Sequence, residues 1–260
     1  MNVIAIVSAK GGVGKTTLTA NLATALDRLG VATLLLADLD PQNALGLHFG
    51  VDPKSLAGLS RATLAGESWG DVCVPGRSGV HVLPYGVVNE SDRVAFERHL
   101  EAHPHWLAEQ LQSLELPPDA VVLIDTPPGP SVYMQQALAA AHAVVVISLP
   151  DAASYASLAL MHRLVHTYCT SRPGFVDTFY VVNQTDSARQ LSKDITRVMQ
   201  DNLGEQLIGV IHEDEAVREA LAYDQNVLEY DAQCQAADDL RKCARVLAQR
   251  LNLRLTGSMS

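Results

Sequence analysis

A glycine-rich turn near the N-terminus constrains this chain more than any other segment. It consists of Lys10, Gly11, Gly12, Val13, Gly14, Lys15, Thr16 and Thr17. An apolar run at residues 3–7 precedes it, and apolar side chains recur at helical spacing after it as far as Leu29. A strand, a glycine-rich turn and a helix in this order form a loop whose backbone N–H groups can bind phosphate, because glycine lets the backbone approach the oxygens closely. In such a loop Lys15 reaches the β- and γ-phosphates, and the Thr16 hydroxyl coordinates Mg²⁺.

The turn departs from the general pattern G-x-x-x-x-G-K-[ST] at its first position. Ala9 stands where that pattern has glycine, and a second lysine, Lys10, follows it. A surface turn with two lysines is the simpler alternative. The length of the match and its place between a strand and a helix favour a phosphate-binding loop.

Two further apolar runs end in aspartate. Residues 32–37 lead into a segment of Asp38, Leu39, Asp40, Pro41 and Gln42, and residues 120–124 lead into Asp125, Thr126, Pro127, Pro128 and Gly129. The carboxyl ends of parallel strands meet at one edge of an open α/β sheet, so we expect these carboxylates beside the phosphate loop. Asp125 is suited to hold a water on Mg²⁺, and the Pro-Pro-Gly segment to respond to loss of the γ-phosphate.

The remaining pattern alternates strands with helices. Strands are expected near residues 3, 33, 80, 120, 144, 178 and 207, and helices at 56–65, 92–114 with a break near 103–105, 152–170, 188–202, 216–222 and 232–253. This order predicts a doubly wound, mostly parallel sheet flanked by helices. We expect a single domain over residues 1–255 and a disordered tail at 256–260.

Two polar residues follow the last predicted strands. Asn183 ends the strand near residue 178, where its amide can pair with an adenine edge, although asparagines in such places commonly make turns. Asp214, in the loop after the strand near 207, is a predicted helix N-cap.

Composition narrows the class of protein. The net charge of −10 argues against a general polyanion binder, although it allows a local basic patch. The four cysteines are scattered without a C-x-x-C pair, which fits reduced cytosolic thiols. Neither a secretory leader nor an apolar run of membrane-spanning length is expected, so we place the protein in the cytoplasm.

The three motifs in this order resemble the ParA/MinD family of deviant Walker A ATPases, which belong to the SIMIBI class of P-loop proteins. The resemblance extends from Asn2 to about Leu253. It implies that ATP and Mg²⁺ are the cofactors. It also implies a homodimer that sandwiches two nucleotides, in which Lys10 of each subunit reaches the ATP of the other.

The resemblance assigns further roles position by position. Lys15 corresponds to the lysine on the β- and γ-phosphates, Thr16 to the Mg²⁺ ligand and Thr17 to an α-phosphate contact. Asp40 corresponds to the residue that positions the attacking water, and Asp38 and Asp125 to carboxylates near Mg²⁺. On the adenine side stand Asn183 and, in the loop after the last strand, His212 and Asp214.

One branch of the family is favoured. Many members have an Ile-Pro-x-Asp segment after the last strand, where this chain has His212 in place of proline. Together with residues 49–52, 66–69 and 83–86, this resembles the cellulose-biosynthesis branch, the BcsQ (YhjQ) type. That resemblance implies a slow ATPase that serves the cellulose synthase secretion system at the inner membrane, often at a cell pole, through protein partners.

Two other branches remain open. A partition ATPase would bind DNA in its ATP-bound dimer, and the C-terminal helix offers a basic set of Arg241, Lys242, Arg245, Arg250 and Arg254. A MinD-type protein would bind the membrane through an amphipathic helix, for which residues 247–255 are the candidate. A relative of the nitrogenase iron protein is rejected, because no cysteine lies near Asp125.

Overall fold

The apolar runs form an eight-stranded sheet in the computed structural model, which describes residues 1–256. Its strand order is β3-β4-β2-β5-β1-β6-β7-β8, and all neighbouring strands are parallel except β3 and β4. The strands are β1 (Asn2–Val7), β2 (Leu34–Asp38), β3 (Val74–Pro75), β4 (Val80–Leu83), β5 (Val121–Asp125), β6 (Ala143–Ser148), β7 (Asp177–Thr185) and β8 (Leu207–His212). The predicted doubly wound sheet is therefore confirmed.

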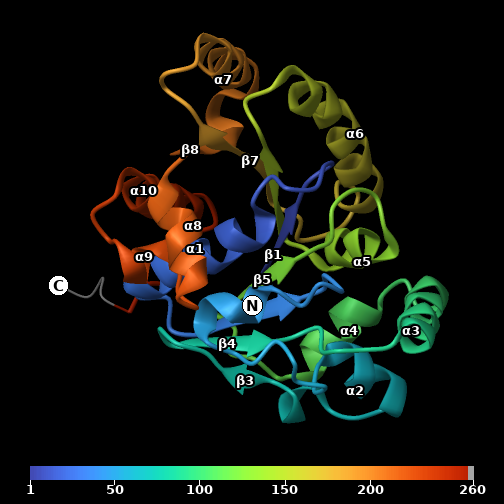
Figure 1. Cartoon of the computed structure of the whole chain (residues 1–260). Coiled ribbons are helices and arrows are strands. Elements are labelled where there is room, and N and C mark those ends of the chain that lie inside the picture. The colour runs from blue at the N-terminus through green and yellow to red at the C-terminus, as the bar shows by residue number, and fades with distance from the viewer. Residues whose placement is uncertain (257–260) are drawn as a thin grey trace.

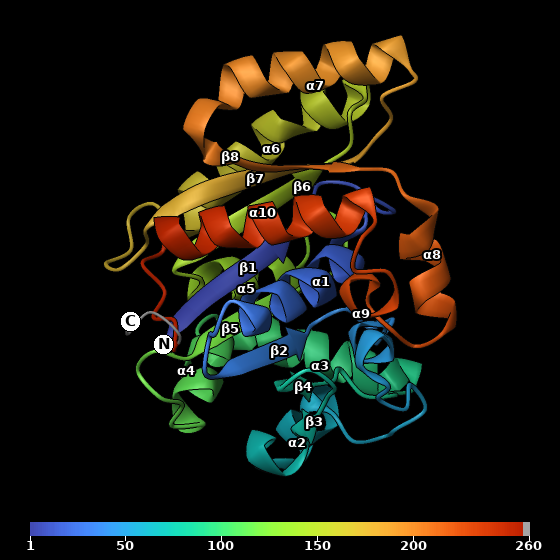
Figure 2. The same ribbon diagram turned by 90° about the vertical axis from the view of Figure 1, so that its left-hand side faces the viewer.

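Helices cover both faces of this sheet (Figure 1). They are α1 (Lys15–Arg28), α2 (Leu59–Ala65), α3 (Glu90–Ala102), α4 (Trp106–Ser113), α5 (Val132–Ala140), α6 (Ala152–Tyr168), α7 (Gln190–Leu203), α8 (Glu215–Ala222), α9 (Val227–Tyr230) and α10 (Gln235–Arg250), with short 3-10 turns at Leu45–Phe49, Trp69–Asp71 and Gly204–Gln206. Figure 2 shows α1 and α10 side by side in front of the sheet. Helices α2 to α6 pack on the opposite face.

Strand β1 shows why the apolar runs are unbroken. Ile4 and Ile6 point into the core beneath α1 and α10, whereas Val3 and Ala5 point into the core beneath α4 and α5. A strand buried on both faces needs apolar side chains at every position. The phosphate loop follows β1, so it emerges from the middle of the sheet.

Helix ends follow local signals. Gly14 and Gly30 have positive φ angles of 85° and 96° at the two ends of α1, a conformation that glycine adopts without strain. Pro104 lies between α3 and α4, where the predicted helix was expected to break. Asp214 caps α8, since its side chain accepts from the backbone N–H of Ala216.

Three elements were absent from the prediction. β3 is a two-residue antiparallel edge strand that includes Pro75, so it is too short to show periodicity. α5 begins at Val132, shortly after the Pro-Pro-Gly segment, and its mostly small and apolar sequence lacks a polar face because the helix is largely buried. α9 is only four residues long.

The last described residues pack against the sheet. Leu247, Leu251 and Leu253 are buried in the core on the α1 side, so the apolar residues proposed for membrane contact are used in packing. Thr256, the first residue of the predicted tail, donates its backbone N–H to the Gly30 carbonyl at 2.8 Å. Residues 257–260 lie outside the described residues. Among the described helices, none combines the length and hydropathy needed to cross a bilayer.

The segment before α2 and the loop after β4 are in direct backbone contact at two glycines, Gly58 and Gly86. A Cβ on Gly58 would lie 2.4 Å from the Gly86 nitrogen, so only glycine fits there. Leu59 and Ser60 donate their backbone N–H groups to the carbonyls of Pro84 and Tyr85. The segment before α2 is thus fixed to the loop that follows β4.

We expect a buried histidine to make stability depend on pH. His48 is 2 % exposed, and burial lowers its pKa to about 4. Unfolding returns the ring to an ordinary pKa near 6.5, so the unfolded chain binds more protons between these values. The free energy of unfolding should therefore fall as pH drops from 6.5 to 4, by up to about 3 kcal/mol from this residue.

Urea unfolding of the wild type and His48→Gln across this range measures the effect. The glutamine amide can still donate to the Gln225 carbonyl, which His48 contacts, but it does not titrate. The variant should lose less stability toward acid, whereas His81→Gln, at an exposed position of β4, should follow the wild type. Burial raises the pKa of Asp38 and Asp125, so these two carboxyls make the free energy of unfolding rise as the pH drops. This contribution is the same in the wild type and in both variants, so it does not affect the comparison. Identical slopes for the wild type and His48→Gln would contradict this account.

Candidate functional site

The glycine-rich turn joins the end of β1 to the start of α1, as predicted. Gly12 and Gly14 have φ angles of 73° and 85°. The first backbone N–H groups of α1 have no partners within the helix, so they face the turn with the positive end of the helix dipole. This arrangement suits an anion such as a phosphate.

Lys15 lies within this turn and is almost fully buried. It is 6 % exposed, and its Nζ donates to Ser8 Oγ at 3.0 Å. Burial lowers the pKa of Lys15, while the charges of Asp125 and Asp40 oppose that shift. A cation kept partly dehydrated beside carboxylates is suited to bind an anionic group that enters the turn.

Four oxygen-bearing side chains converge beside Lys15. Thr16 Oγ1 donates to Asp125 Oδ2 at 2.6 Å, and Thr19 Oγ1 lies 3.4 Å from Asp125 Oδ1. Asp38 is the register neighbour of Asp125 on the adjacent strand β2, and both are fully buried. Burial raises the pKa of both carboxyls, and the charge of Asp125 adds to the rise at Asp38. Hard oxygen donors with excess negative charge are the environment that Mg²⁺ prefers.

The loop after β2 is fixed by its own aspartates. Asp38 accepts from the backbone N–H groups of Asp40 at 2.9 Å and Leu45 at 3.1 Å. Asp40 accepts from the Gln42 N–H at 2.9 Å. Asn43 Oδ1 accepts from the Gly86 N–H at 3.2 Å, which links this loop to the one after β4. Asp40 is therefore held on a short, hydrogen-bonded loop at the carboxyl edge.

The Pro-Pro-Gly segment lies against the phosphate loop. Gly129 donates its N–H to the Ser8 carbonyl at 3.0 Å, and a Cβ on Gly11 would lie 3.6 Å from Pro128. Thr126 is buried, and its hydroxyl donates to the Ile6 carbonyl at 2.8 Å. Segment 125–129 thus contacts the loop directly.

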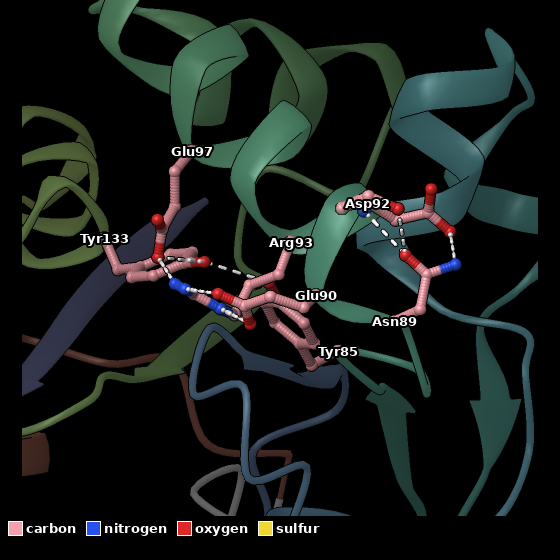
Figure 3. Close-up of polar contacts among 8 residues, drawn as sticks. Tyr85, Asn89, Glu90, Asp92, Arg93, Glu97 and Tyr133 are labelled. Carbon is pink, nitrogen blue, oxygen red and sulfur yellow. Dashed lines mark hydrogen bonds and ion pairs between the residues drawn. The ribbon is translucent and has the colours of Figure 1, made fainter.

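A polar network joins α5 to α3 and to the loop after β4 (Figure 3). Tyr133 donates to Glu97 at 3.2 Å and contacts the Tyr85 hydroxyl at 2.9 Å. Arg93 pairs with Glu97 and with Glu90 on the same helix, α3. The network therefore connects the helix that follows the Pro-Pro-Gly segment with two other elements of the fold.

Lys10 lies at the loop entrance and contacts the start of α6. Its Nζ is 3.4 Å from Asp151 Oδ1 and 3.3 Å from Ser154 Oγ. The side chain remains 37 % exposed, so the ion pair is weak and open to water. Lys10 is free to exchange this partner for another anion.

The adenine-side residues of the prediction line one pocket. Its walls include Gly14, Thr17, Asn183, His212 and Asp214. Asn183 Nδ2 donates to the Val13 carbonyl at 2.8 Å, so the residue contacts the phosphate loop itself. The pocket therefore begins where the loop ends.

Sequence reasoning missed several contact residues. Ser8 and Thr19 flank the motif that contains Lys15. Ser8 accepts a hydrogen bond from Lys15, and Thr19 donates one to Asp125. Asp151 follows the end of β6, so the same sheet-edge rule that selected Asp125 could have identified it. Asp239, which contacts His212, lies on a helix 27 residues away, and no motif marks it.

Known proteins share this sequence and fold. The family model described as cellulose biosynthesis protein BcsQ matches residues 1–249. The BcsQ protein of Escherichia coli (strain K12) is 29 % identical over 248 residues, covering 92 % of this chain and 91 % of that protein. The chromosome partitioning protein ParA of Caulobacter vibrioides is 29 % identical over 265 residues, covering 96 % of this chain and 95 % of that protein.

Solved structures agree with the fold. The septum site-determining protein MinD from Pyrococcus horikoshii, complexed with Mg-ADP, has a TM-score of 0.79 and 25 % identity, with 98 % of this chain and 99 % of that one covered. The fold and the motif set are those of ParA/MinD-type P-loop ATPases. Because the family match extends over nearly the whole chain, this protein belongs to the BcsQ family of cellulose biosynthesis proteins.

Proposed function

We propose that this protein is an ATP-dependent dimerisation switch that hydrolyses ATP slowly with Mg²⁺. The observation that carries the proposal is the buried Lys15 beside Thr16, Asp125 and Asp38, at the start of α1. Residues 1–255 would form the ATPase domain. The similarity to MinD complexed with Mg-ADP supports both cofactors.

Each residue of the site has a role in binding or hydrolysis. The loop N–H groups and Lys15 would hold the β- and γ-phosphates, and Thr17 would contact the α-phosphate. Thr16, Asp125 and Asp38 would hold Mg²⁺, which when bound neutralises phosphate charge. Asp40 would orient the attacking water, and Asn183, His212 and Asp214 would contact the base. Such positioning supplies most of the catalysis in phosphoryl transfer.

Lys10 would make hydrolysis depend on dimerisation. Its amino group is exposed and weakly paired, so it can reach a second copy of the chain without losing a strong contact. The phosphates of the partner's ATP would attract it more strongly than Asp151 does. The dimer would then form with ATP and separate after hydrolysis, as Pro127, Pro128 and Gly129 respond to the lost phosphate.

We infer a role as an accessory and localisation ATPase of the bacterial cellulose synthase secretion system. Membership of the BcsQ family supports this role. The protein would be cytoplasmic and would be recruited to the inner membrane, or to a cell pole, by protein partners of the synthase.

The partition alternative is less well supported. The similarity to ParA favours it, but several basic residues of the C-terminal helix are paired with carboxylates. Lys242 lies 2.6 Å from Asp238, and Arg250 lies 3.0 Å from Glu205. Phosphate contacts with DNA would have to replace these pairs.

Affinity capture from the source cell separates the two roles. Tagged wild-type protein with ATP and Mg²⁺ should retain cellulose synthase components, and Lys15→Ala, which should not bind nucleotide, should retain fewer. Capture of partition proteins, together with duplex DNA binding that falls steeply with salt, would instead favour the ParA-type function.

A further inference from the structure

A buried carboxylate on α10 holds the imidazole of His212 at the edge of the base pocket. Asp239 is 7 % exposed. Its Oδ2 lies 2.8 Å from His212 Nδ1 and accepts the His212 backbone N–H at 3.1 Å. Its Oδ1 accepts from Gln235 Nε2 at 2.9 Å. Both oxygens are occupied, so the carboxylate is fixed in orientation.

This contact determines which ring nitrogen carries the proton. A carboxylate only accepts hydrogen bonds, so Nδ1 of His212 must donate to Asp239. In the neutral ring Nε2 then keeps its lone pair and acts as an acceptor. A histidine held in this way presents one defined acceptor on the side away from α10.

The ring borders the pocket that begins at the phosphate loop. His212 lines this pocket together with Gly14, Thr17 and Asn183, and its side chain is 38 % exposed. A nucleotide whose phosphates occupy the loop would extend its base toward this pocket. The two purine bases differ here, because adenine has a donor amino group at the position where guanine has the acceptor O6.

We propose that His212, positioned by Asp239, selects adenine over guanine in the bound nucleotide. Nε2 accepts a hydrogen bond from the adenine amino group. With guanine, the lone pair of Nε2 would face the acceptor O6, and the two acceptors would repel each other. The inference rests on the proposed nucleotide-binding function and deepens it. Asp239 is a positioning residue, since it acts through His212.

Three triphosphates test the selection at pH 8 with Mg²⁺: ATP, GTP and purine riboside triphosphate, which lacks the amino group. The wild type should bind ATP about 10-fold more tightly than the purine riboside compound, and GTP more weakly still. In His212→Phe, ATP affinity should fall to that of the purine riboside compound, whose own affinity should not change. His162→Phe, at an exposed position of α6, should keep the wild-type ratios.

An unchanged ratio of ATP to purine riboside affinity in His212→Phe would overturn the inference. A wild type that binds none of the three compounds would overturn the proposed function, and this inference with it. The two failures are therefore distinguishable.

The tautomer of His212 gives a readout that a purely structural role of Asp239 would not produce. Nitrogen-15 spectra of the imidazole at pH 8 should show the proton on Nδ1 in the wild type. Asp239→Ala should shift it toward Nε2 and remove the preference for ATP, whereas Asp239→Asn, which keeps an acceptor, should retain most of both. A wild-type spectrum with the proton on Nε2 would overturn the assignment without any variant.

Discussion

Lys15→Ala should abolish tight ATP binding, with a loss of affinity of about 100-fold or more. Lys15 lies in the glycine-rich turn, where its ammonium would make charge-assisted hydrogen bonds to two phosphates. Each such bond contributes about 1.5–3 kcal/mol, so losing both accounts for the expected change. Isothermal titration with ATP and Mg²⁺ measures it directly.

The stability of this variant provides an internal check. Burial lowers the pKa of Lys15, which means that the charged form of this side chain is less stable in the folded protein than in water. A cooperative melting transition of Lys15→Ala without nucleotide would show that the variant is folded, so that weak ATP binding could be attributed to the lost phosphate contacts. Lys54→Ala, at an exposed loop position, is the matched control and should bind as the wild type does. Unchanged ATP affinity in Lys15→Ala would disprove the phosphate-loop assignment.

Asp40→Ala should bind ATP and stay dimeric after binding it, because hydrolysis should be slowed by about 10²–10⁴-fold. The Asp40 backbone N–H donates to Asp38, which pairs in register with Asp125, and in the proposed mechanism Asp40 orients the attacking water. Without it the γ-phosphate would be retained, and the contacts proposed to hold the dimer would persist. Size-exclusion chromatography with light scattering, in ATP and Mg²⁺, should show a stable dimer.

A second substitution separates chemistry from loop structure. Asp40 also accepts from the Gln42 N–H, and Asp40→Asn keeps that acceptor but is a poor base. Both variants should therefore be trapped as dimers. Adding Lys10→Ala should return either variant to the monomer, because the contact across the dimer is removed. An Asp40→Ala protein that elutes as a monomer with ATP and Mg²⁺ would refute the switch.

Much of the fold could be predicted because its signals are local. The buried strands β1, β2, β5 and β6 appear as unbroken apolar runs, and the sheet-edge rule indicated that Asp38 and Asp125 follow strands at the carboxyl edge. Their register pairing depends on the strand order, which the sequence did not indicate. The start of α1 was marked by glycine, and the break before α4 by Pro104.

The missed features depend on tertiary contacts. α5 is buried on most sides, so it has no amphipathic pattern. The pairing of Lys10 with Asp151, and of His212 with Asp239, joins residues that lie far apart in the sequence. Only the folded sheet brings these partners together, and no spacing rule identifies them.

The backbone contact between Gly58 and Gly86 has a mechanical consequence. Without side chains between them, the segment before α2 and the loop after β4 cannot slide independently, and Asn43 extends this rigid unit to the loop of Asp40. On the other side of the phosphate loop, Lys10 contacts the start of α6 through a weak ion pair with Asp151 and a hydrogen bond to Ser154. The loop of Asp40 would therefore keep its place beside a bound phosphate, whereas Lys10 could change its partner without disturbing that loop.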